Sequence, residues 1–314
     1  MPAPSLRQPV GIVGLGLIGG SLGLDLQARG VEVRGLVRRQ ATALRARERA
    51  LATEVGTDPA LLRECGLVVL ALPLDRLLDP DPAFLEALPL NAVLTDVGSV
   101  KGPVLECWRQ RLTSAGRAAQ VPLFVPGHPM AGTASAGVEA GEYGLFAGRP
   151  WVATPGEGTD PGALQAVREL AEAVGACWLT CPPGQHDQAA ALISHLPVLV
   201  GAALLATADR GSGERGVGDL ARFLASSGFA DTTRVGGGPP ELGTLMARLN
   251  QQALLGSLAT YREELAALEA LVAAGRWPEL AQRLGRAQTL RPAFLAIDPA
   301  GGSAVADDSS PGEA

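Results

Sequence analysis

Residues 9–23 read PVGIVGLGLIGGSLG, and this stretch decides the fold. A short apolar run meets glycines spaced as G-x-G-x-x-G, and apolar residues with helical spacing continue to residue 29. A strand, a glycine turn and a helix in this order are typical of a dinucleotide-binding unit: the first glycine allows the tight turn, the second lets the backbone approach a pyrophosphate, and the third lets the helix pack against the strand. The residues that we expect to hold the dinucleotide here are Gly14, Gly16, Leu17, Ile18 and Gly19.

Apolar strands and helical segments alternate beyond this turn. The predicted strands are VEVRGLV (31–37), LVVLALP (67–73), NAVLTDVG (91–98), WVATP (151–155) and ACWLTC (176–181), with a helix at about 161–174. Alternation of this kind predicts an α/β fold with a doubly wound, Rossmann-type parallel sheet. Because such sheets bind ligands at the carboxyl ends of their strands, we expect Leu72 and Pro73 to line the cofactor.

The end of the second predicted strand indicates which dinucleotide binds. An enzyme that uses NAD would carry an acidic residue there, to accept hydrogen bonds from the ribose 2′-hydroxyl. RGLVRRQ (34–40) instead carries Arg38 and Arg39, and guanidinium groups pair bidentately with phosphate. Thr42 adds a hydroxyl donor near the start of the next helix. These residues favour NADP over NAD; the alternative is that both arginines are solvated surface charges.

The second half of the chain has a helical pattern with no convincing strand from residue 185 to 295. QAAALISHLPVLVGAALLATADR (188–210) predicts a long helix that Pro197 should kink. LGTLMARLNQQALLGSLATYREELAALEALV (242–272) predicts a second long helix. It is apolar on most faces, so we expect a second subunit to cover it in a homodimer. The expected organisation is a dinucleotide-binding domain at 1–181, an all-helical substrate and dimerisation domain at 182–296, and a disordered acidic tail at 297–314.

Composition excludes several kinds of partner. The chain of 314 residues has a net charge of −6, which argues against a nucleic-acid-binding surface. Its four cysteines form no CxxC pair, so a metal site is not expected, and thiols in a reducing compartment are the simple interpretation. The N-terminus carries no signal pattern, and glycine, proline or charge interrupts the longest apolar runs. We therefore expect a cytoplasmic protein without a membrane span.

Four further motifs carry residue types suited to chemistry. They are TDVGSVK (95–101), PGHPMAGT (126–133), HDQAAALISHLP (186–197) and SSGFADTTRV (226–235), which is followed by GGGPPELG. Together with the glycine turn, and in this order, they resemble the prephenate/arogenate dehydrogenase family over nearly the whole chain. VRRQ, HPMAGTA, SHLPVLV and GGGPPELGTLM are most similar to its NADP-dependent arogenate dehydrogenase branch. The resemblance implies oxidative decarboxylation of arogenate, a 4-hydroxycyclohexadienyl compound, to tyrosine with hydride transfer to NADP.

The resemblance also implies the catalytic residues. His128 matches the family's catalytic histidine, and histidine suits a general base that receives the C4 hydroxyl proton near neutral pH. Ser99 matches the serine that orients this hydroxyl and the histidine; its alternative is a helix N-cap. Lys101 is the only lysine of the chain, and we interpret it as a solvated charge in the first turn of a helix, without a catalytic role.

Arg234 matches the family arginine that holds the side-chain carboxylate of the substrate, a task that suits a bidentate guanidinium. A salt bridge with Asp231 is the alternative. His186 and Ser194 are eight residues apart and would project within about 80° of each other on a straight helix, so we expect both to face the substrate. His195 projects about half a turn from His186, and we expect it to be packed or at an interface.

Three departures from the family pattern favour arogenate over prephenate. Family members that act on prephenate often read SHLPH, HPIAGTE and GFRD, where this chain has Val198, Ala134 and Ala230. Besides prephenate dehydrogenase, two other interpretations stay open. β-Hydroxyacid dehydrogenases have a similar two-domain plan but use a lysine from the helix between the domains, and no lysine follows Lys101. A non-enzymatic NADPH-binding sensor would need no serine–histidine pair.

Overall fold

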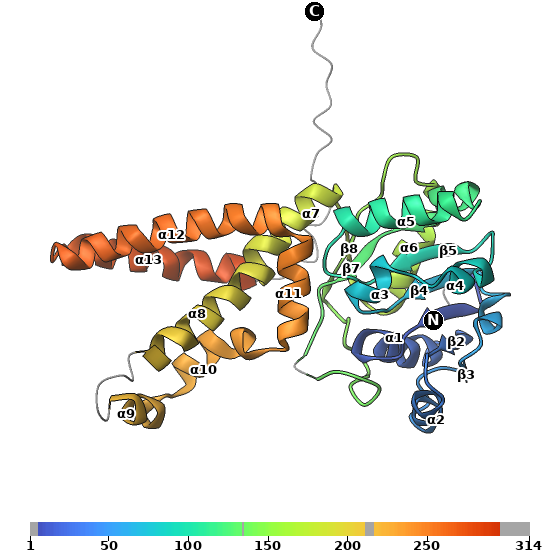
Figure 1. Cartoon of the computed structure of the whole chain (residues 1–314), viewed down its shortest axis with the longest axis horizontal. Helices are drawn as coiled ribbons and strands as arrows, with labels where there is room; N and C mark the ends of the chain where they lie inside the picture. The colour runs from blue at the N-terminus through green and yellow to red at the C-terminus, as the bar shows by residue number, and fades with distance from the viewer. Residues whose placement is uncertain (1–5, 134, 211–216, 296–314) are drawn as a thin grey trace, which may run out of the picture. The chain divides into compact units, whose positions relative to one another are not determined.

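The structure, a computed structural model, describes residues 6–133, 135–210 and 217–295. The chain divides into two compact units, one formed mainly by the residues up to Pro183 and the other by Gly184–Phe294 (Figure 1). The acidic tail expected at 297–314 lies outside the described residues.

The first unit is built on a six-stranded sheet whose strands are all parallel. The strand order is β3-β2-β1-β4-β5-β6, so the chain starts in the middle and extends the sheet first to one edge and then to the other. This confirms the predicted doubly wound α/β fold. The strands are β1 (Val10–Val13), β2 (Val33–Leu36), β3 (Glu54–Gly56), β4 (Leu67–Leu70), β5 (Val93–Asp96) and β6 (Phe124–Val125). The sequence pattern does not predict β3 and β6, because so short a run carries no periodicity.

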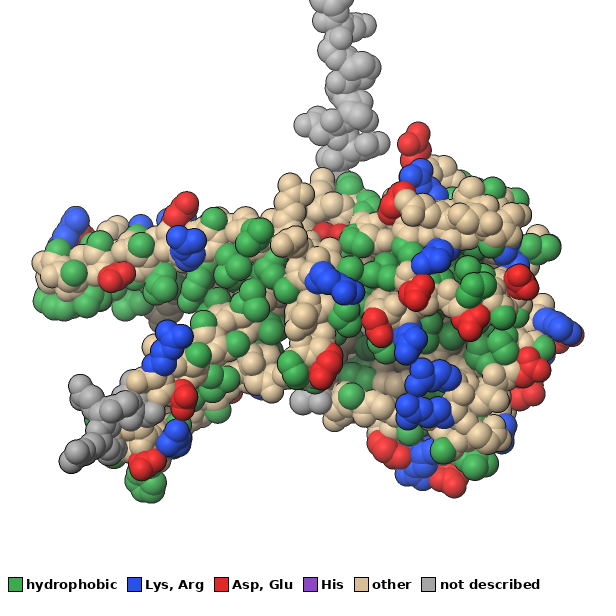
Figure 2. Space-filling model, viewed as in Figure 1, with side chains coloured by type: hydrophobic (Ala, Val, Ile, Leu, Met, Phe, Trp, Pro, Cys, Tyr) green, Lys and Arg blue, Asp and Glu red, His purple; other side chains and the backbone are tan. Residues whose placement is uncertain are grey.

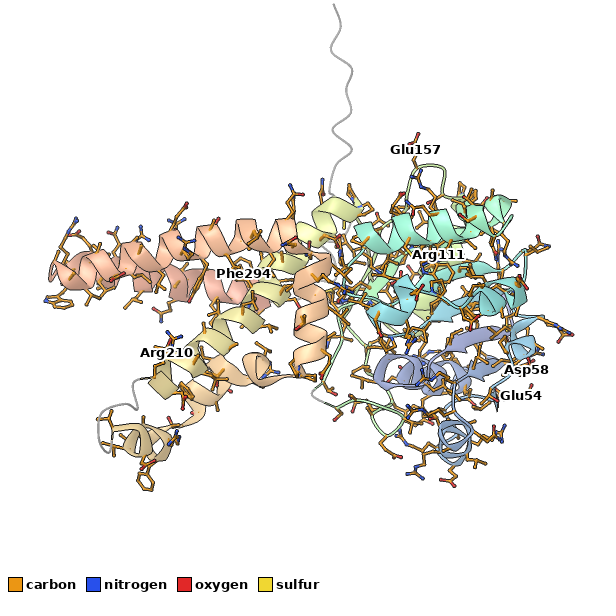
Figure 3. All side chains as sticks on the ribbon, in the orientation of Figure 1. Glu54, Asp58, Arg111, Glu157, Arg210 and Phe294 are labelled. Atoms are coloured by element: carbon orange, nitrogen blue, oxygen red, sulfur yellow. The ribbon has the colours of Figure 1, made fainter. Side chains whose placement is uncertain are left out.

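Helices cover this sheet, and apolar side chains fill the space between. Every residue of β1, β4 and β5 is buried, as expected for parallel strands enclosed on both faces. Arg111 on α5 donates to Asp79 at the end of α3 over 2.9 Å, which links two of the covering helices (Figure 3). The helices are α1 (Leu17–Gln27), α2 (Gln40–Glu48), α3 (Leu74–Leu78), α4 (Pro82–Ala87), α5 (Gly102–Ser114) and α6 (Pro161–Ala173), with 3₁₀ turns at Pro59–Leu62 and Ala118–Leu123.

A second, three-stranded sheet belongs to the same unit. It contains β7 (Gly127–Pro129), β8 (Pro150–Ala153) and β9 (Cys177–Thr180), with β8 in the middle. β7 runs antiparallel to β8 and pairs His128 with Val152, whereas β9 runs parallel to β8. The predicted strands at 151–155 and 176–181 are confirmed. β7 is missed, because its Gly-His-Pro composition is typical of a turn.

The described part of the second unit is all helical, as predicted. Its elements are α7 (Pro183–Ala190), a π-helical turn (Ala191–His195), α8 (Leu196–Arg210), α9 (Val217–Leu224), α10 (Ser227–Thr233), a 3₁₀ turn (Arg234–Gly237), α11 (Pro240–Leu249), α12 (Gln251–Ala273) and α13 (Trp277–Leu295). Arg210 marks the end of α8 in Figure 3.

The prediction of one continuous helix over 242–272 is wrong. Asn250 separates α11 from α12, with φ −119° and ψ 33°. Its side-chain amide donates to the backbone carbonyl of Asp187 and lies 3.2 Å from Nδ1 of His195. The apolar pattern runs through this break without interruption, so the break depends on tertiary contacts that the pattern does not carry.

Pro197 disturbs its helix in the turn before its own position. Proline has no N–H to donate to the carbonyl of Ile193, four residues earlier, and its ring crowds that carbonyl. The turn Ala191–His195 is π-helical, which accommodates the lost bond by widening the helix. The expected disturbance at Pro197 therefore takes the form of a π turn.

The helix that runs from Pro183 to Arg210 is, among the described residues, the one stretch long and apolar enough to cross a membrane. Its best window has a mean hydropathy of 2.0 and is 22% buried. Length and composition alone are weak evidence for a span, because a helix that packs inside a water-soluble protein passes the same test.

Apolar side chains of the second unit remain exposed in the single chain. Figure 2 shows hydrophobic side chains gathered along α8 and α12. Helix α13 buries none of its residues, and α12 buries only two. The exposed large apolar side chains of α12 and α13 are Leu255, Leu265, Val272, Trp277, Leu284, Leu290, Phe294 and Leu295.

Candidate functional site

The turn after β1 has the geometry of a dinucleotide-binding loop. Gly14 has a φ of +94°, and a Cβ there would lie 2.3 Å from the carbonyl oxygen of Ala71. A Cβ at Gly19 would lie 1.9 Å from the carbonyl oxygen of Gly14, so only glycine lets α1 begin this close to the turn. A Cβ at Gly16 would meet nothing within 4 Å, which leaves that backbone accessible to a ligand.

Helix α1 presents its N-terminus at this turn. Its N-cap is Gly16, which has no side chain to bond the first N–H groups of the helix. Those N–H groups and the helix dipole suit a phosphate. Leu17 and Ile18 are the first helical residues and are half-buried. The turn therefore fits the pyrophosphate of a dinucleotide.

The end of β2 carries two exposed cations. Arg38 and Arg39 follow the strand, and Arg39 is the N-cap of α2 without a side-chain capping bond. The neighbouring ion pairs are formed by Arg34 and Arg45 instead, with glutamates. Thr42 is half-buried in the first turn of α2. The arrangement leaves two guanidinium groups available at the place where a ribose substituent is read.

Leu72 and Pro73 follow β4 at the same edge of the sheet. Pro73 is the exposed N-cap of α3, and Leu72 is half-buried. A Cβ at Gly14 would lie 3.6 Å from a side-chain methyl of Leu72, so this leucine lies beside the glycine turn. The structure thus brings the loops after β1 and β4 together.

Ser99 and His128 lie on two segments that meet at the carboxyl end of β5. Ser99 is half-buried in the turn between β5 and α5, and His128 is the half-buried middle residue of β7. β7 packs against the end of β5, since a Cβ at Gly127 would lie 3.0 Å from the carbonyl oxygen of Asp96. The N-cap of α5 is Lys101, two residues after Ser99.

The interpretation of Lys101 as a solvated charge is also wrong, because its side chain is 0% exposed. Nζ of Lys101 lies 2.5 Å from Oδ2 of Asp96 and 2.6 Å from the carbonyl oxygen of Gly127. Burial raises the pKa of Asp96, and the charge of Lys101 opposes that shift. The sequence signal for this pair is a single lysine five residues after an aspartate that ends an apolar strand. Nothing in the local pattern says that the lysine turns inward.

Hydrogen bonds join the loop that follows β7 to two helices. On α1, Ser21 and Asp25 each accept a backbone N–H of this loop at 2.9 Å. On α2, Nε of Arg45 donates to Glu139 at 2.5 Å, and this guanidinium holds the pKa of Glu139 below its usual range. The loop next to His128 is therefore held by the same helices that start at the glycine turn and at the two exposed arginines.

Four polar residues of the second unit form a buried cluster: His186, Asp187, His195 and Asn250. Nδ1 of His186 lies 2.8 Å from Oδ1 of Asp187, and the amide of Asn250 donates to the carbonyl of Asp187 at 2.7 Å. Because this amide nitrogen is a donor, Nδ1 of His195 accepts from it, and the neutral ring carries its proton on Nε2. That Nε2 is buried and has no hydrogen-bond partner among the described residues. Burial lowers the pKa of His195.

The straight-helix geometry assumed for His186 and Ser194 does not apply. The π turn Ala191–His195 contains Ser194 and has more residues per turn than an α-helix, so the angle of 80° is wrong. His186 is 4% exposed and Ser194 is half-buried. His195 is packed, with 2% exposure.

Arg234 begins the 3₁₀ turn of the second unit and is exposed. The ion pairs of the described residues include none between Arg234 and Asp231, so that alternative is not realised. A Cβ at Gly236 would lie 2.2 Å from the backbone nitrogen of Ala202, so the turn packs directly on α8. This close approach fixes the backbone that carries Arg234.

The described residues contain no group of three or more His, Cys, Asp or Glu that could hold a metal ion. The four cysteines all lie in described segments, and no disulfide joins them. Of the expected site residues, the cofactor set with Ser99 and His128 is in the first unit. His186, Ser194 and Arg234 are in the second. Sequence reasoning missed Asp96 and Asp187, which lie inside two of the motifs, and Asn250, which lies outside them and contacts Asp187 and His195.

Two family models match consecutive parts of the chain. Residues 22–179 match the nucleotide-binding domain of prephenate dehydrogenase, and residues 182–286 match the dimerization domain of prephenate dehydrogenase.

Solved structures are similar over most of the chain. Arogenate dehydrogenase from Synechocystis is 43% identical, with a TM-score of 0.78, over 91% of this chain and 99% of that one. Prephenate dehydrogenase from A. aeolicus, in complex with hydroxyphenyl propionate and NAD+, is 26% identical, with a TM-score of 0.80, over 91% of this chain and 97% of that one.

A relative by sequence, prephenate dehydrogenase from Bacillus subtilis, is 29% identical over 76% of this chain. The match spans only 62% of the length of that relative.

Proposed function

The chain belongs to the prephenate dehydrogenase family, and on that basis we propose that it is an NADP-dependent arogenate dehydrogenase, which converts L-arogenate to L-tyrosine and carbon dioxide. One arrangement in the first unit carries the proposal. A dinucleotide-binding turn follows β1, and Ser99 and His128 lie at the carboxyl end of β5 in the same sheet. Oxidation of the C4 hydroxyl group requires a hydride acceptor and a general base, and this edge of the sheet offers a place for each.

The proposed base is His128. A ring nitrogen of His128 receives the C4 hydroxyl proton while the C4–H bond breaks, and Ser99 holds the hydroxyl and the imidazole in line. NADP, when bound, supplies the acceptor for the hydride. The bond between the ring and its carboxylate then breaks, its electron pair makes the ring aromatic, and His128 returns the proton to the phenolate oxygen. Carbon dioxide leaves, and the aromatic ring supplies the driving force.

The preference for NADP rests on Arg38 and Arg39. Both are exposed at the end of β2, where an acidic residue would select NAD, and the neighbouring ion pairs do not use them. A ribose 2′-phosphate would accept charge-assisted hydrogen bonds from these guanidinium groups, and Thr42 adds a hydroxyl. The 2′-hydroxyl of NAD would leave the two cations without an anionic partner.

The preference for arogenate rests on similarity and on three substitutions. The Synechocystis protein that is 43% identical is an arogenate dehydrogenase. Val198 and Ala230 stand where family members that act on prephenate often have histidine and arginine, and Ala134, outside the described residues, stands where they often have an acid. Both substrates carry the side-chain carboxylate that we assign to the exposed Arg234. His186 and Ser194 complete the proposed substrate set.

We propose further that two chains associate through their helical units in a cytoplasmic enzyme. The match of residues 182–286 to a dimerization domain supports this, as do the exposed apolar side chains of α12 and α13. An apolar surface of this kind on a water-soluble protein is typical of a subunit interface.

The test is steady-state kinetics of the purified protein, followed at 340 nm, with four combinations: arogenate or prephenate, each with NADP or NAD. We expect the highest kcat/KM with arogenate and NADP. Equal efficiency with NAD would overturn the cofactor assignment, and a higher kcat/KM with prephenate would identify a prephenate dehydrogenase. Binding of NADPH without turnover of either substrate would identify a sensor instead.

A further inference from the structure

The buried pair of Asp96 and Lys101 has no part in the chemistry proposed above. Lysine is almost never fully buried unless it is paired, and here both side chains are 0% exposed. Nζ of Lys101 reaches Oδ2 of Asp96 at 2.5 Å and the carbonyl oxygen of Gly127 at 2.6 Å. Because an apolar pair of similar volume often stabilises a core equally well, a buried ion pair calls for a reason beyond stability.

The remaining bonds of Asp96 show which segments the pair holds. Oδ2 accepts the backbone N–H of Gly98 at 2.7 Å, and Oδ1 faces the backbone N–H of Gly127 at 3.3 Å. The pair therefore bonds to Gly127 at both polar backbone groups, its N–H and its carbonyl. The residue after Gly127 is His128, and the residue after Gly98 is Ser99.

The surroundings leave β7 little room to move. A Cβ at Gly127 would lie 3.0 Å from Nε1 of Trp151 and 3.1 Å from Oγ1 of Thr95. The segment therefore packs against β5 on one side and against β8 on the other, and the ion pair adds directional bonds to that packing. The pairing with β8 sets the register of β7, and the ion pair bonds the two polar groups of Gly127, which ties β7 to the end of β5 as well.

We propose that Asp96 and Lys101 are positioning residues, which hold the serine and the histidine of the site in the alignment that proton transfer needs. The inference rests on the proposed function, since it concerns the proton transfer at His128. A general base must lie within hydrogen-bond reach of the proton that it removes, and a misplacement of about 1 Å costs on the order of 10²-fold in rate. Neither residue of the pair touches the substrate; both act through the backbone of Gly98 and Gly127.

The experiment measures the single-turnover rate of NADPH formation with arogenate, and the KM for each substrate, for Lys101→Met. We expect a rate lower by about 10- to 10²-fold, with both KM values within about threefold of wild type. The matched control is Arg117→Met. Arg117 is another buried cation that donates to backbone carbonyls, those of Glu86 and Leu88, away from Ser99 and His128. The Arg117→Met variant should have a lower Tm, but its single-turnover rate should stay within about threefold of wild type.

A double-mutant cycle separates positioning from a general loss of structure. If Lys101 acts through the histidine, adding Lys101→Met to His128→Asn should cost less than threefold more, because the alignment no longer matters once the base is absent. A full additional 10- to 10²-fold loss would overturn the proposal, and so would a wild-type rate in the single variant. If Lys101→Met does not fold, Asp96→Asn/Lys101→Met removes both charges, leaves no unpaired buried carboxylate and is measured in its place. A wild-type protein that turns over neither arogenate nor prephenate would refute the proposed function instead.

Discussion

The two units enclose their apolar side chains to different extents. In the first, every residue of three central strands is buried, and helices complete a closed core. In the second, α12 buries only Leu254 and Ser257, and α13 buries no residue at all. A unit with a closed core can arrange its site alone, whereas a unit with uncovered apolar faces depends on what packs against it.

The ion pair of the first unit and the histidine cluster of the second also differ, although both units contain buried polar atoms without a hydrogen-bond partner among the described residues. In the first unit, Lys101 bonds to Asp96 and to a backbone carbonyl, and the charges are matched. In the second unit, Nε2 of His195 is buried without a partner among the described residues. We therefore expect changes in the first unit to alter chemistry and cofactor choice, and changes in the second to alter assembly and the pH dependence of stability.

The largest effect is expected for the proposed base, His128, in the first unit. His128→Asn should lower kcat by about 10²–10⁴-fold, the usual contribution of a general base. NADP affinity should stay near that of wild type, because the cofactor contacts that we propose lie on the glycine turn and at Arg38. The acid limb of the pH–rate profile should disappear as well. Steady-state kinetics across pH measures both, and a variant with more than about a tenth of the wild-type kcat would place the base elsewhere.

The next effect concerns the uncovered faces of the second unit. Leu265→Glu combined with Val272→Glu places charges on α12 where we expect a subunit interface, and should raise the dimer Kd by about 10²-fold or more. Sedimentation velocity over a concentration series measures this. The matched control is Leu44→Glu on α2 of the first unit, since Leu44 is 53% exposed and Leu265 is 51% exposed. The comparison between the units fails if both variants dissociate alike, or if wild type is a monomer at micromolar concentration.

A smaller effect is expected for the cofactor. Arg38→Asp replaces a charge-assisted pair with repulsion, so NADP should bind more weakly by about 1.5–3 kcal/mol, which is roughly 10- to 150-fold. NAD should bind as well as before or better. Fluorescence titration with NADPH and NADH gives both affinities, and Arg63→Asp, an exposed arginine after the first 3₁₀ turn, provides the same charge change elsewhere. An unchanged NADPH affinity in Arg38→Asp would show that the arginines are only solvated charges.

The smallest effect is expected for His195. Burial lowers the pKa of His195 in the folded protein, so the unfolded chain binds the extra proton more readily. Stability from this residue is therefore complete above the unfolded value, near 6.5, and is lost as the pH falls from there toward the lower folded value. The slope is at most about 1.4 kcal/mol per pH unit. In urea unfolding at pH 7.5 and 5.5, at one protein concentration, His195→Gln should lose less stability between the two pH values than wild type does; equal losses would contradict the assignment.

Much of the first unit could be predicted because its signals are local. The spacing of Gly14, Gly16 and Gly19 predicts a tight turn. In the structure, a Cβ at Gly14 or Gly19 would clash with backbone atoms, whereas the backbone of Gly16 is open. The apolar runs of the central strands are long enough to be recognised as strands from the sequence. The short strand β7 could not be read, because Gly127–Pro129 becomes a strand only through pairing with β8, a partner more than twenty residues away.

The helical half was predicted as a class but not in detail. Hydrophobic spacing identifies helices, yet it does not register the break at Asn250, which depends on bonds to Asp187 and His195 more than fifty residues earlier. The hydrophobic spacing also predicted a regular α-helix through Ser194, but the chain forms a π turn there.

The sequence by itself determined the alternation of the longer strands and helices in the first unit, the helical class of the second, the dinucleotide turn, the two arginines after the second strand and the motifs that contain Ser99 and His128. These features depend on residue type and on spacing along the chain, and both can be read directly from the sequence. Only the tertiary structure decided that Lys101 turns inward to Asp96 and Gly127, and that His195 is enclosed beside Asn250. Burial and partnership of a polar side chain depend on segments that folding brings together, so the same lysine is a solvated charge in the local pattern and a buried ion pair in the folded unit.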